Sequence, residues 1–187
     1  SVEEDAAVFL MLVNSHYYLE EFDVAVPYLL QHMELERTNG NTIDRNIYNL
    51  LFSMYVQLED YQSAHGVARE MVTLFDEPAD WRNLAAVNSM LEMETKRVQV
   101  LETSYIKGYL ENEAQYMNLA QSLAGSDAPY QGAQILAEGM EKGVVEENQE
   151  NLERLTQMYL LANEYEMALV PARKAAEMAE TGDAYDY

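Results

Sequence analysis

Histidine and carboxylate side chains are the residues of this sequence that could bind a metal or transfer protons. The three histidines are His16, His32 and His65. A metal site on a helix needs further ligands at matched spacing, as in a His-Glu-x-x-His motif, and the sequence contains no such motif. We therefore predict that the three histidines are partly buried packing residues and that the chain supplies no metal site.

Acidic residues form three clusters, for which acid–base chemistry, calcium binding and helix-start stabilisation are the alternatives. The clusters are Glu3-Glu4-Asp5, Glu111/Glu113 and Glu146-Glu147 with Glu150. Calcium favours a ligand-dense loop that bends at a glycine, whereas these clusters come just before or inside the first turns of predicted helices. Carboxylates there stabilise the positive end of the helix dipole by ~0.3–1 kcal/mol each. We expect helix-start stabilisation.

Other sequence signatures of catalysis are absent. There is no cysteine, no Gly-x-Ser-x-Gly motif and no glycine-rich phosphate loop. The 11 methionines include one Met-x-x-Met pair, Met90 and Met93, so they are predicted to fill the core rather than bind copper. The sequence therefore predicts no catalytic residue and no cofactor, and it indicates that the protein is not an enzyme.

The net charge restricts the classes of partner. Lysine and arginine number 11 against 33 acidic residues, which gives a formal charge of −22. Nucleic acids and anionic membrane surfaces are poor partners for such a polyanion, so a basic or neutral protein or peptide is expected. The longest apolar run, residues 6–13, is far shorter than the ~20 residues that span a bilayer, so no membrane insertion is predicted.

The stretch 151–179 shows which secondary-structure elements the sequence forms. Steps of three and four residues keep side chains on one face of a helix, and a step of six between Tyr159 and Tyr165 leaves room for a tight turn. The pattern predicts two antiparallel helices. Its apolar or small residues are Leu152, Leu155, Tyr159, Tyr165, Ala168, Ala172 and Ala175.

The same hairpin pattern recurs along the whole chain. Aligning the chain on the position of Ala168 gives Ala25, Ala64, Arg97, Ala133 and Ala168, and all of these except Arg97 are small and follow an aromatic residue three positions earlier. Their spacings are 39 (64−25), 33 (97−64), 36 (133−97) and 35 (168−133). With the WRNLA sequence that begins at Trp81, this pattern resembles the tetratricopeptide repeat (TPR), whose period is about 34 residues.

The resemblance covers essentially the whole chain and implies an all-α fold. The expected architecture is a right-handed superhelical solenoid of antiparallel helix-turn-helix repeats, about five and a half units in all. The expected units are 6–40, 45–77, 78–112, 113–146 and 149–180, and a sixth begins at 182–187 and is cut off. Uncapped ends of this kind allow a homodimer.

Four sequence segments indicate a narrower resemblance: VLETSYIKGYL, NLAQSL, GAQILAEGMEKGVV and YEMALVPARKAAEMAETGDAY. They are similar to TPR proteins associated with TonB-type energy-transduction systems of Gram-negative bacteria, which are envelope proteins on the periplasmic side. This resemblance implies a periplasmic location and a connection to TonB-dependent transport. A cytoplasmic location is the alternative.

Packing expectations follow from the repeat. Ala25, Ala64, Ala133 and Ala168 are expected to be buried where the two helices of a hairpin cross. Unit three has Glu94 and Arg97 in place of the aromatic and small residues, so its hairpin is expected to be splayed or shifted. At the end of the chain, Tyr185 and Tyr187 are expected to lie against the second helix of unit five.

The first helices of TPR-type repeats line a concave face, which the resemblance identifies as a groove for a partner. We predict that Tyr17, Asn49, Arg82, Met117 and Gln121 lie on this face and bind the partner. The function predicted from the sequence is a non-enzymatic protein–protein interaction adaptor or scaffold. The alternative is a regulatory or assembly subunit of an enzyme or of a larger multidomain protein.

Overall fold

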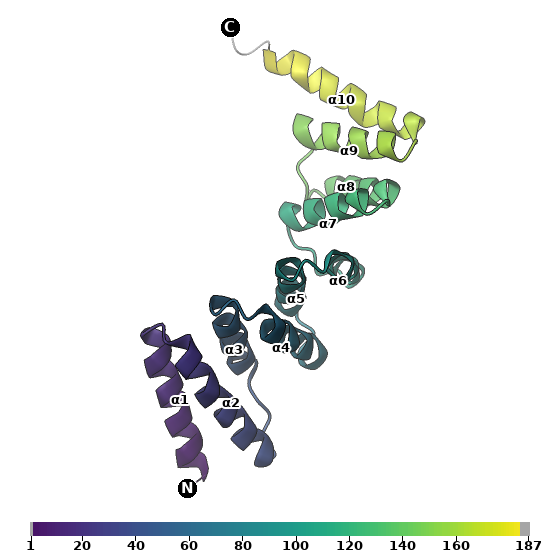
Figure 1. The fold of residues 1–187 in the computed structure, drawn as a ribbon. Helices are drawn as coiled ribbons and strands as arrows, with labels where there is room; N and C mark the ends of the chain where they lie inside the picture. Colours follow the sequence, from purple (N-terminus) through teal and green to yellow (C-terminus); the bar gives the residue numbers. More distant parts are fainter. Residues whose placement is uncertain (1, 184–187) are drawn as a thin grey trace. The chain divides into compact units, whose positions relative to one another are not determined.

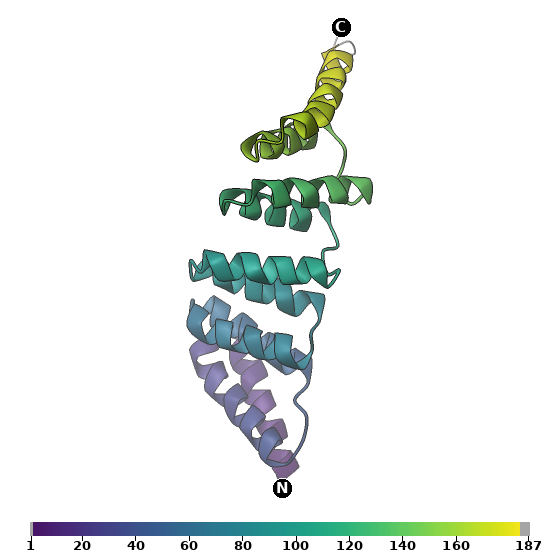
Figure 2. The same ribbon diagram turned by 90° about the vertical axis from the view of Figure 1, so that its right-hand side faces the viewer.

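A computed structural model of the chain describes residues 2–183, which form ten α-helices and no strand. The chain divides into two compact units, Ser1–Val100 and Leu101–Tyr187, which we describe separately (Figures 1 and 2). Tyr185 and Tyr187, like most of the expected start of a sixth repeat, lie outside the described residues.

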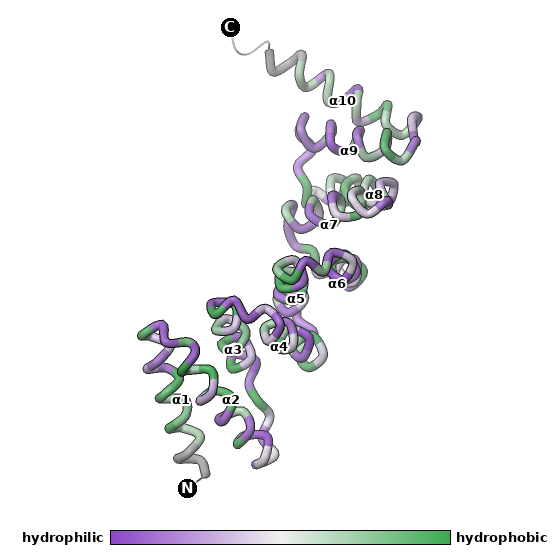
Figure 3. Tube along the Cα trace, in the orientation of Figure 1, coloured by the Kyte–Doolittle hydropathy of each residue, from purple (hydrophilic) through white to green (hydrophobic). Residues whose placement is uncertain are grey.

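Each unit consists of helical hairpins joined by short connections. The first unit holds α1 (Val2–Tyr18), α2 (Phe22–Thr38), α3 (Arg45–Gln57), α4 (Tyr61–Leu74), α5 (Pro78–Met90) and the start of α6 (Glu94–Ile106). The second unit holds the rest of α6, α7 (Glu113–Gly125), α8 (Pro129–Glu141), α9 (Gln149–Leu161) and α10 (Tyr165–Asp183). Apolar and polar residues are interspersed along the coloured parts of the helices, as expected for helices covered on one face (Figure 3).

Short polar side chains determine where the first helices of the hairpins begin. Asp44 accepts a hydrogen bond from the backbone N–H of Asn46 at 2.7 Å, and Asn112 and Asn148 cap α7 and α9 in the same way. Such N-caps contribute about 1 kcal/mol each, because they satisfy amides that have no partner inside the helix.

The five hairpin turns share one backbone conformation. In each, a single residue between the two helices has a positive φ of 54–61°, and we call it the turn residue: Glu20, Glu59, Glu92, Asp127 and Asn163. The residue after the turn residue donates its N–H to the carbonyl of the residue four positions before the turn residue, at 2.8–2.9 Å in all five turns. This is the helix-ending arrangement that usually contains glycine. Turn residues follow one another at 39, 33, 35 and 36 residues (59−20, 92−59, 127−92 and 163−127).

The turn of the third hairpin has the same conformation as the other four. Met93 N donates to Asn88 O at 2.8 Å, the bond that closes the other turns, so the turn itself is regular; that the two helices of this hairpin are splayed or shifted stays a prediction. Arg97 occupies the small-residue position and is only half-buried. Its guanidinium binds the carboxylate of Glu94, with 2.8 Å between Nε and Oε2.

The helices of a hairpin cross five residues after the turn residue. Ala25, Ala64 and Ala168 occupy this position and are buried, as predicted. In the fourth hairpin the position belongs to Gly132, where an added Cβ would lie 2.5 Å from the carbonyl oxygen of Ala120. Ala133 is buried too, but it is not the crossing residue.

The second helix of one hairpin packs against the first helix of the next. In the first unit, Ala64 and Ala68 of α4 form a buried cluster with Leu84 and Val87 of α5. Phe52 of α3 packs against the same cluster. The apolar face of one hairpin is thus covered by the following first helix, as expected for a repeat that cannot bury its own face.

Candidate interaction surfaces

The five residues predicted to bind a partner lie on first helices, in two sets. Tyr17, Asn49 and Arg82 belong to α1, α3 and α5 of the first unit, and Met117 and Gln121 belong to α7 of the second. Arg82 and Gln121 are exposed, whereas the other three are partly buried. The ring of Tyr17 packs edge-on against Phe22, with 5.4 Å between ring centroids, so it also stabilises its own hairpin. That the two sets act together as one groove stays a prediction.

Polar side chains connect successive first helices near their N-termini. Asp80, the third residue of α5, has no exposed surface. It accepts hydrogen bonds from Nη2 of Arg45 at 2.7 Å and from Nε of Arg45 at 3.1 Å. It also accepts the backbone N–H of Glu77 at 3.1 Å, and Asp80 therefore caps its own helix while binding the first residue of α3. This hydrogen bonding raises the pKa of Arg45.

A corresponding connection exists in the second unit. Asn151, the third residue of α9, donates to the carboxylate of Glu113, the first residue of α7, at 2.8 Å. It also donates to the carbonyl of Glu146 at 2.9 Å. Glu113 and Glu150 lie in first helical turns, which agrees with the predicted structural role of the acidic clusters.

The three histidines are packing residues, as predicted. His32 is buried, and its Nδ1 donates to the carbonyl of Ala6 at 3.1 Å. His16 stacks on Tyr28 with 5.8 Å between centroids. Burial lowers the pKa of His65, and the charges of neighbouring basic residues lower it further. Among the described residues, no group of three or more histidine, aspartate or glutamate side chains is placed to hold a metal ion.

A groove of about 350 Å³ lies between α6, α7 and α8 of the second unit. Leu123 and Ile135 are buried and supply an apolar floor. Ile106 stands beside it with 81% of its surface exposed. The polar lining consists of carboxylates, amides and one phenol: Glu102, Glu138, Gln131, Gln134 and Tyr105. Sequence reasoning missed this surface because three helices contribute to it, although Ile106, directly before Lys107 and Gly108, was a detectable signal.

The carboxylate of Glu138 is the electrostatic centre of this groove. The phenol of Tyr105 donates to it, and Lys142 forms an ion pair with it one helical turn away. Lys142 and then Tyr105 lower the pKa of Glu138, so the group is ionised at neutral pH. The same hydrogen bond raises the pKa of Tyr105 to about 12. The groove therefore combines the ion pair of Glu138 and Lys142, and the carboxylate of Glu102, with apolar surface.

The comparisons with known proteins bear on the fold. No protein-family model and no curated protein matches the sequence. A crystal structure of MamA matches with a TM-score of 0.62 and 13% identity, over 99% of this chain and 97% of that chain. MamA 41-end from Desulfovibrio magneticus RS-1 matches with a TM-score of 0.59 and 15% identity, over 100% of both chains.

A third solved structure is YrrB, described as a TPR protein with an unusual peptide-binding site. It matches with a TM-score of 0.62 and 16% identity, over 94% of this chain and 87% of that chain. This chain has a TPR fold. The predicted all-helical repeat architecture is confirmed, whereas none of these similarities supports the narrower resemblance to TonB-associated proteins. In residues 2–183 of the TPR fold, no helix combines the length and the apolar character needed to cross a bilayer.

Proposed function

We propose that the protein is a non-enzymatic adaptor that binds a segment of a basic or neutral protein partner. The observation that carries this proposal is the α6–α8 groove, in which carboxylates flank an apolar floor. Such a surface fits a lysine or arginine side chain next to an apolar one, because the aliphatic part of the side chain covers apolar surface while its charged end reaches a carboxylate.

The residues predicted on the first helices of the two units are the alternative candidate for binding the partner. Asn49 and Gln121 carry amide side chains, which can hydrogen-bond to both the N–H and C=O groups of an extended peptide. Arg82 offers a cation for a carboxylate or a carbonyl oxygen of the partner. Tyr17 and Met117 would add apolar contact. The net charge of −22 favours rapid encounter with a basic partner through long-range attraction.

The setting proposed for this adaptor is the periplasm of a Gram-negative bacterium. The support is the resemblance of the stretches around Leu101, Leu119, Ile135 and Tyr165 to TonB-associated TPR proteins. The partner would then be a lysine-rich periplasmic segment of an energy-transduction protein. A chain without cysteine fits the periplasm and the reducing cytoplasm equally well, so the resemblance alone supports this setting.

The proposal is tested by the binding of fluorescent extended peptides, one alternating lysine with leucine and one alternating glutamate with leucine. We expect the basic peptide to bind, with an affinity that falls as salt screens the charges, and the acidic peptide not to bind. One variant carries Arg82→Glu with Met117→Glu, and another carries Glu102→Lys. A matched control carries Glu146→Gln with Glu147→Gln, which removes acidic charge outside both surfaces.

Each outcome identifies a surface. Loss of binding in the Arg82/Met117 variant places the peptide on the first helices, and loss in the Glu102 variant places it in the α6–α8 groove. Equal binding by the wild type and all the variants would reject both surfaces. Equal binding of the two peptides would reject the predicted preference for a basic partner.

A further inference from the structure

The end of each first helix has one position that the repeat leaves exposed. The residue two positions before the turn residue is exposed in all five hairpins: Tyr18, Gln57, Met90, Gly125 and Leu161. The second, third and fourth hairpins are preceded and followed by another hairpin in the chain, so a neighbouring repeat does not cover this position. In the fourth hairpin this position and the next are Gly125 and Ser126, so a hairpin of this fold requires no apolar side chain there.

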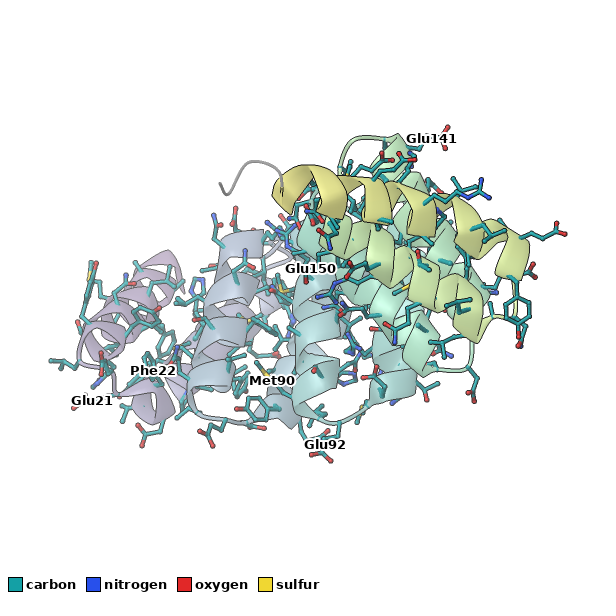
Figure 4. The ribbon with its side chains drawn as sticks, turned by 90° about the horizontal axis from the view of Figure 1, so that it is seen from above. Glu21, Phe22, Met90, Glu92, Glu141 and Glu150 are labelled. Carbon is teal, nitrogen blue, oxygen red and sulfur yellow. The ribbon has the colours of Figure 1, made fainter. Side chains whose placement is uncertain are left out.

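The turns of the first unit nevertheless carry large apolar side chains. Those beside the three turns are Tyr18, Leu19, Leu58 and Met90, which are 86%, 67%, 39% and 45% exposed. Figure 2 shows the three turns on one side of the first unit and the connections between hairpins on the opposite side, and in Figure 4 Glu21, Met90 and Glu92 lie along one edge of it. We call residues 18–21, 57–60 and 90–93 the turn edge. Exposed apolar side chains gathered on one side of a molecule indicate an interaction surface.

Carboxylates stand next to these apolar side chains. The turn edge contains no lysine, arginine or histidine and five acidic residues: Glu20, Glu21, Glu59, Asp60 and Glu92. Within the part of the chain that the structure describes, the carboxylates of the turn residues Glu20, Glu59 and Glu92 form no hydrogen bond and no ion pair. Asn163 holds the same position in the fifth hairpin without a charge, so the fold does not require a carboxylate there. The turn edge thus offers three free carboxylates beside apolar surface.

We propose that the turn edge of the first unit binds a segment of another protein in which lysine or arginine alternates with apolar residues. The apolar residues and the aliphatic parts of the basic side chains cover the apolar surface, while the charged ends reach the free carboxylates. Charge favours this occupant over a second copy of the chain, because a second copy carries the same charge of −22. The turn edge shares no residue with the α6–α8 groove or with the predicted first-helix residues, so this proposal depends on neither.

The test is photo-crosslinking with a peptide that alternates lysine with leucine and carries a benzophenone, followed by mass spectrometry of the digested protein. Protein concentrations up to about 1 mM cover a weak complex. We expect crosslinks in all three segments of the turn edge, and fewer of them as salt screens the charges. The lining residues of the α6–α8 groove begin at Glu102, so the crosslinked positions distinguish the two surfaces.

An apolar-side-chain variant measures the apolar part of the contact. It combines Leu19→Ser, Leu58→Ser and Met90→Ser, and it should lower crosslinking at the turn edge at least about tenfold. Leu74→Ser is the matched control, because Leu74 is 55% exposed and ends α4 on the opposite side of the first unit. Circular dichroism confirms that each variant is folded.

A charge variant combines Glu20→Gln, Glu59→Gln and Glu92→Gln, which keeps the size of the side chains and should lower crosslinking about fivefold at low salt. A wild type without crosslinks at the turn edge, or crosslinks that survive both variants, would overturn the proposal. Crosslinks confined to the α6–α8 groove would overturn it too, while they would support the adaptor function proposed above. A dimer seen by light scattering without peptide, and abolished in the apolar-side-chain variant, would make a second copy the occupant and also overturn the proposal.

Discussion

Replacing Gly132 by alanine tests how closely the helices of the fourth hairpin approach. The added Cβ would lie 2.5 Å from the carbonyl oxygen of Ala120, whereas ordinary van der Waals contacts of a Cβ begin at 3.4 Å. The difference is 0.9 Å (3.4−2.5). Because the obstructing atom belongs to the backbone of α7, no side-chain rotation relieves the clash and the two helices must move apart.

Two effects of opposite sign decide the magnitude. Overpacking costs about 1–3 kcal/mol, and a backbone obstruction belongs in the upper half of that range. Alanine is a better helix former than glycine by ~0.8–1 kcal/mol, which offsets part of the cost. We therefore expect Gly132→Ala to lower the free energy of unfolding by about 1–2 kcal/mol.

The matched control is Gly66→Ala in α4, because an added Cβ there has no atom within 4 Å. With no clash, only the helix-propensity gain remains, so this variant should be more stable by up to about 1 kcal/mol. Urea unfolding followed by far-UV circular dichroism measures both. Amide exchange in α7 and α8 localises the effect of Gly132→Ala, since repeat proteins can unfold in parts. A stabilised Gly132→Ala would refute the close approach.

Three further predictions concern single side chains. Asp80→Ala should destabilise the protein by about 3 kcal/mol. This is the lower end for a broken buried ion pair, because the side chain of Arg45 is 31% exposed and can turn to solvent. Urea unfolding of Asp80→Ala, of Arg45→Ala and of the double variant tests this. Glu92→Gly should raise the melting temperature, since glycine adopts the positive φ without strain, and an unchanged value would contradict a strained turn. Tyr105→Phe should remove one phenol whose pKa is about 12 instead of 10. The difference between the ultraviolet titration curves of the wild type and the variant measures this. The raised pKa of Tyr105 in the folded state stabilises the protein below pH 10, and this stabilisation is lost as the pH rises from 10 to 12. The Tyr105→Phe variant should therefore lose less stability than the wild type across that interval.

The repeat was predictable from the sequence because its spacing rules are local. An aromatic residue followed three positions later by alanine located the crossings at Ala25, Ala64 and Ala168, all of which are buried. The same rule misplaced the fourth crossing by one residue. Pro129 holds the position that Phe22 has in the first hairpin, so counting from the exposed Tyr130 pointed to Ala133.

The third hairpin and the α6–α8 groove show where sequence reasoning stopped. Glu94 and Arg97 replace an aromatic and a small residue, yet the turn before them keeps the hydrogen bond of the other four, which the spacing rule could not show. The groove depends on which side chains of three helices face the same space, and periodicity within one helix gives no information about that. For the same reason the sequence could not show whether the two sets of first-helix residues bind one partner together, since this depends on packing between repeats.

The turn residues have a consequence for the order of folding events. None of the five is glycine, and Glu20, Glu59 and Glu92 have side chains that disfavour a left-handed backbone, while the side chain of Glu92 projects away from the helices and gains no packing in return (Figure 4). At the three turns with glutamate the local sequence opposes the backbone conformation, so helix–helix contacts must impose it. The turns should therefore close after the helices have met, and Glu92→Gly should slow unfolding while leaving the refolding rate almost unchanged. A hairpin excised as a peptide would lose its contacts with the neighbouring hairpin, so its turn should be formed less stably than in the whole chain.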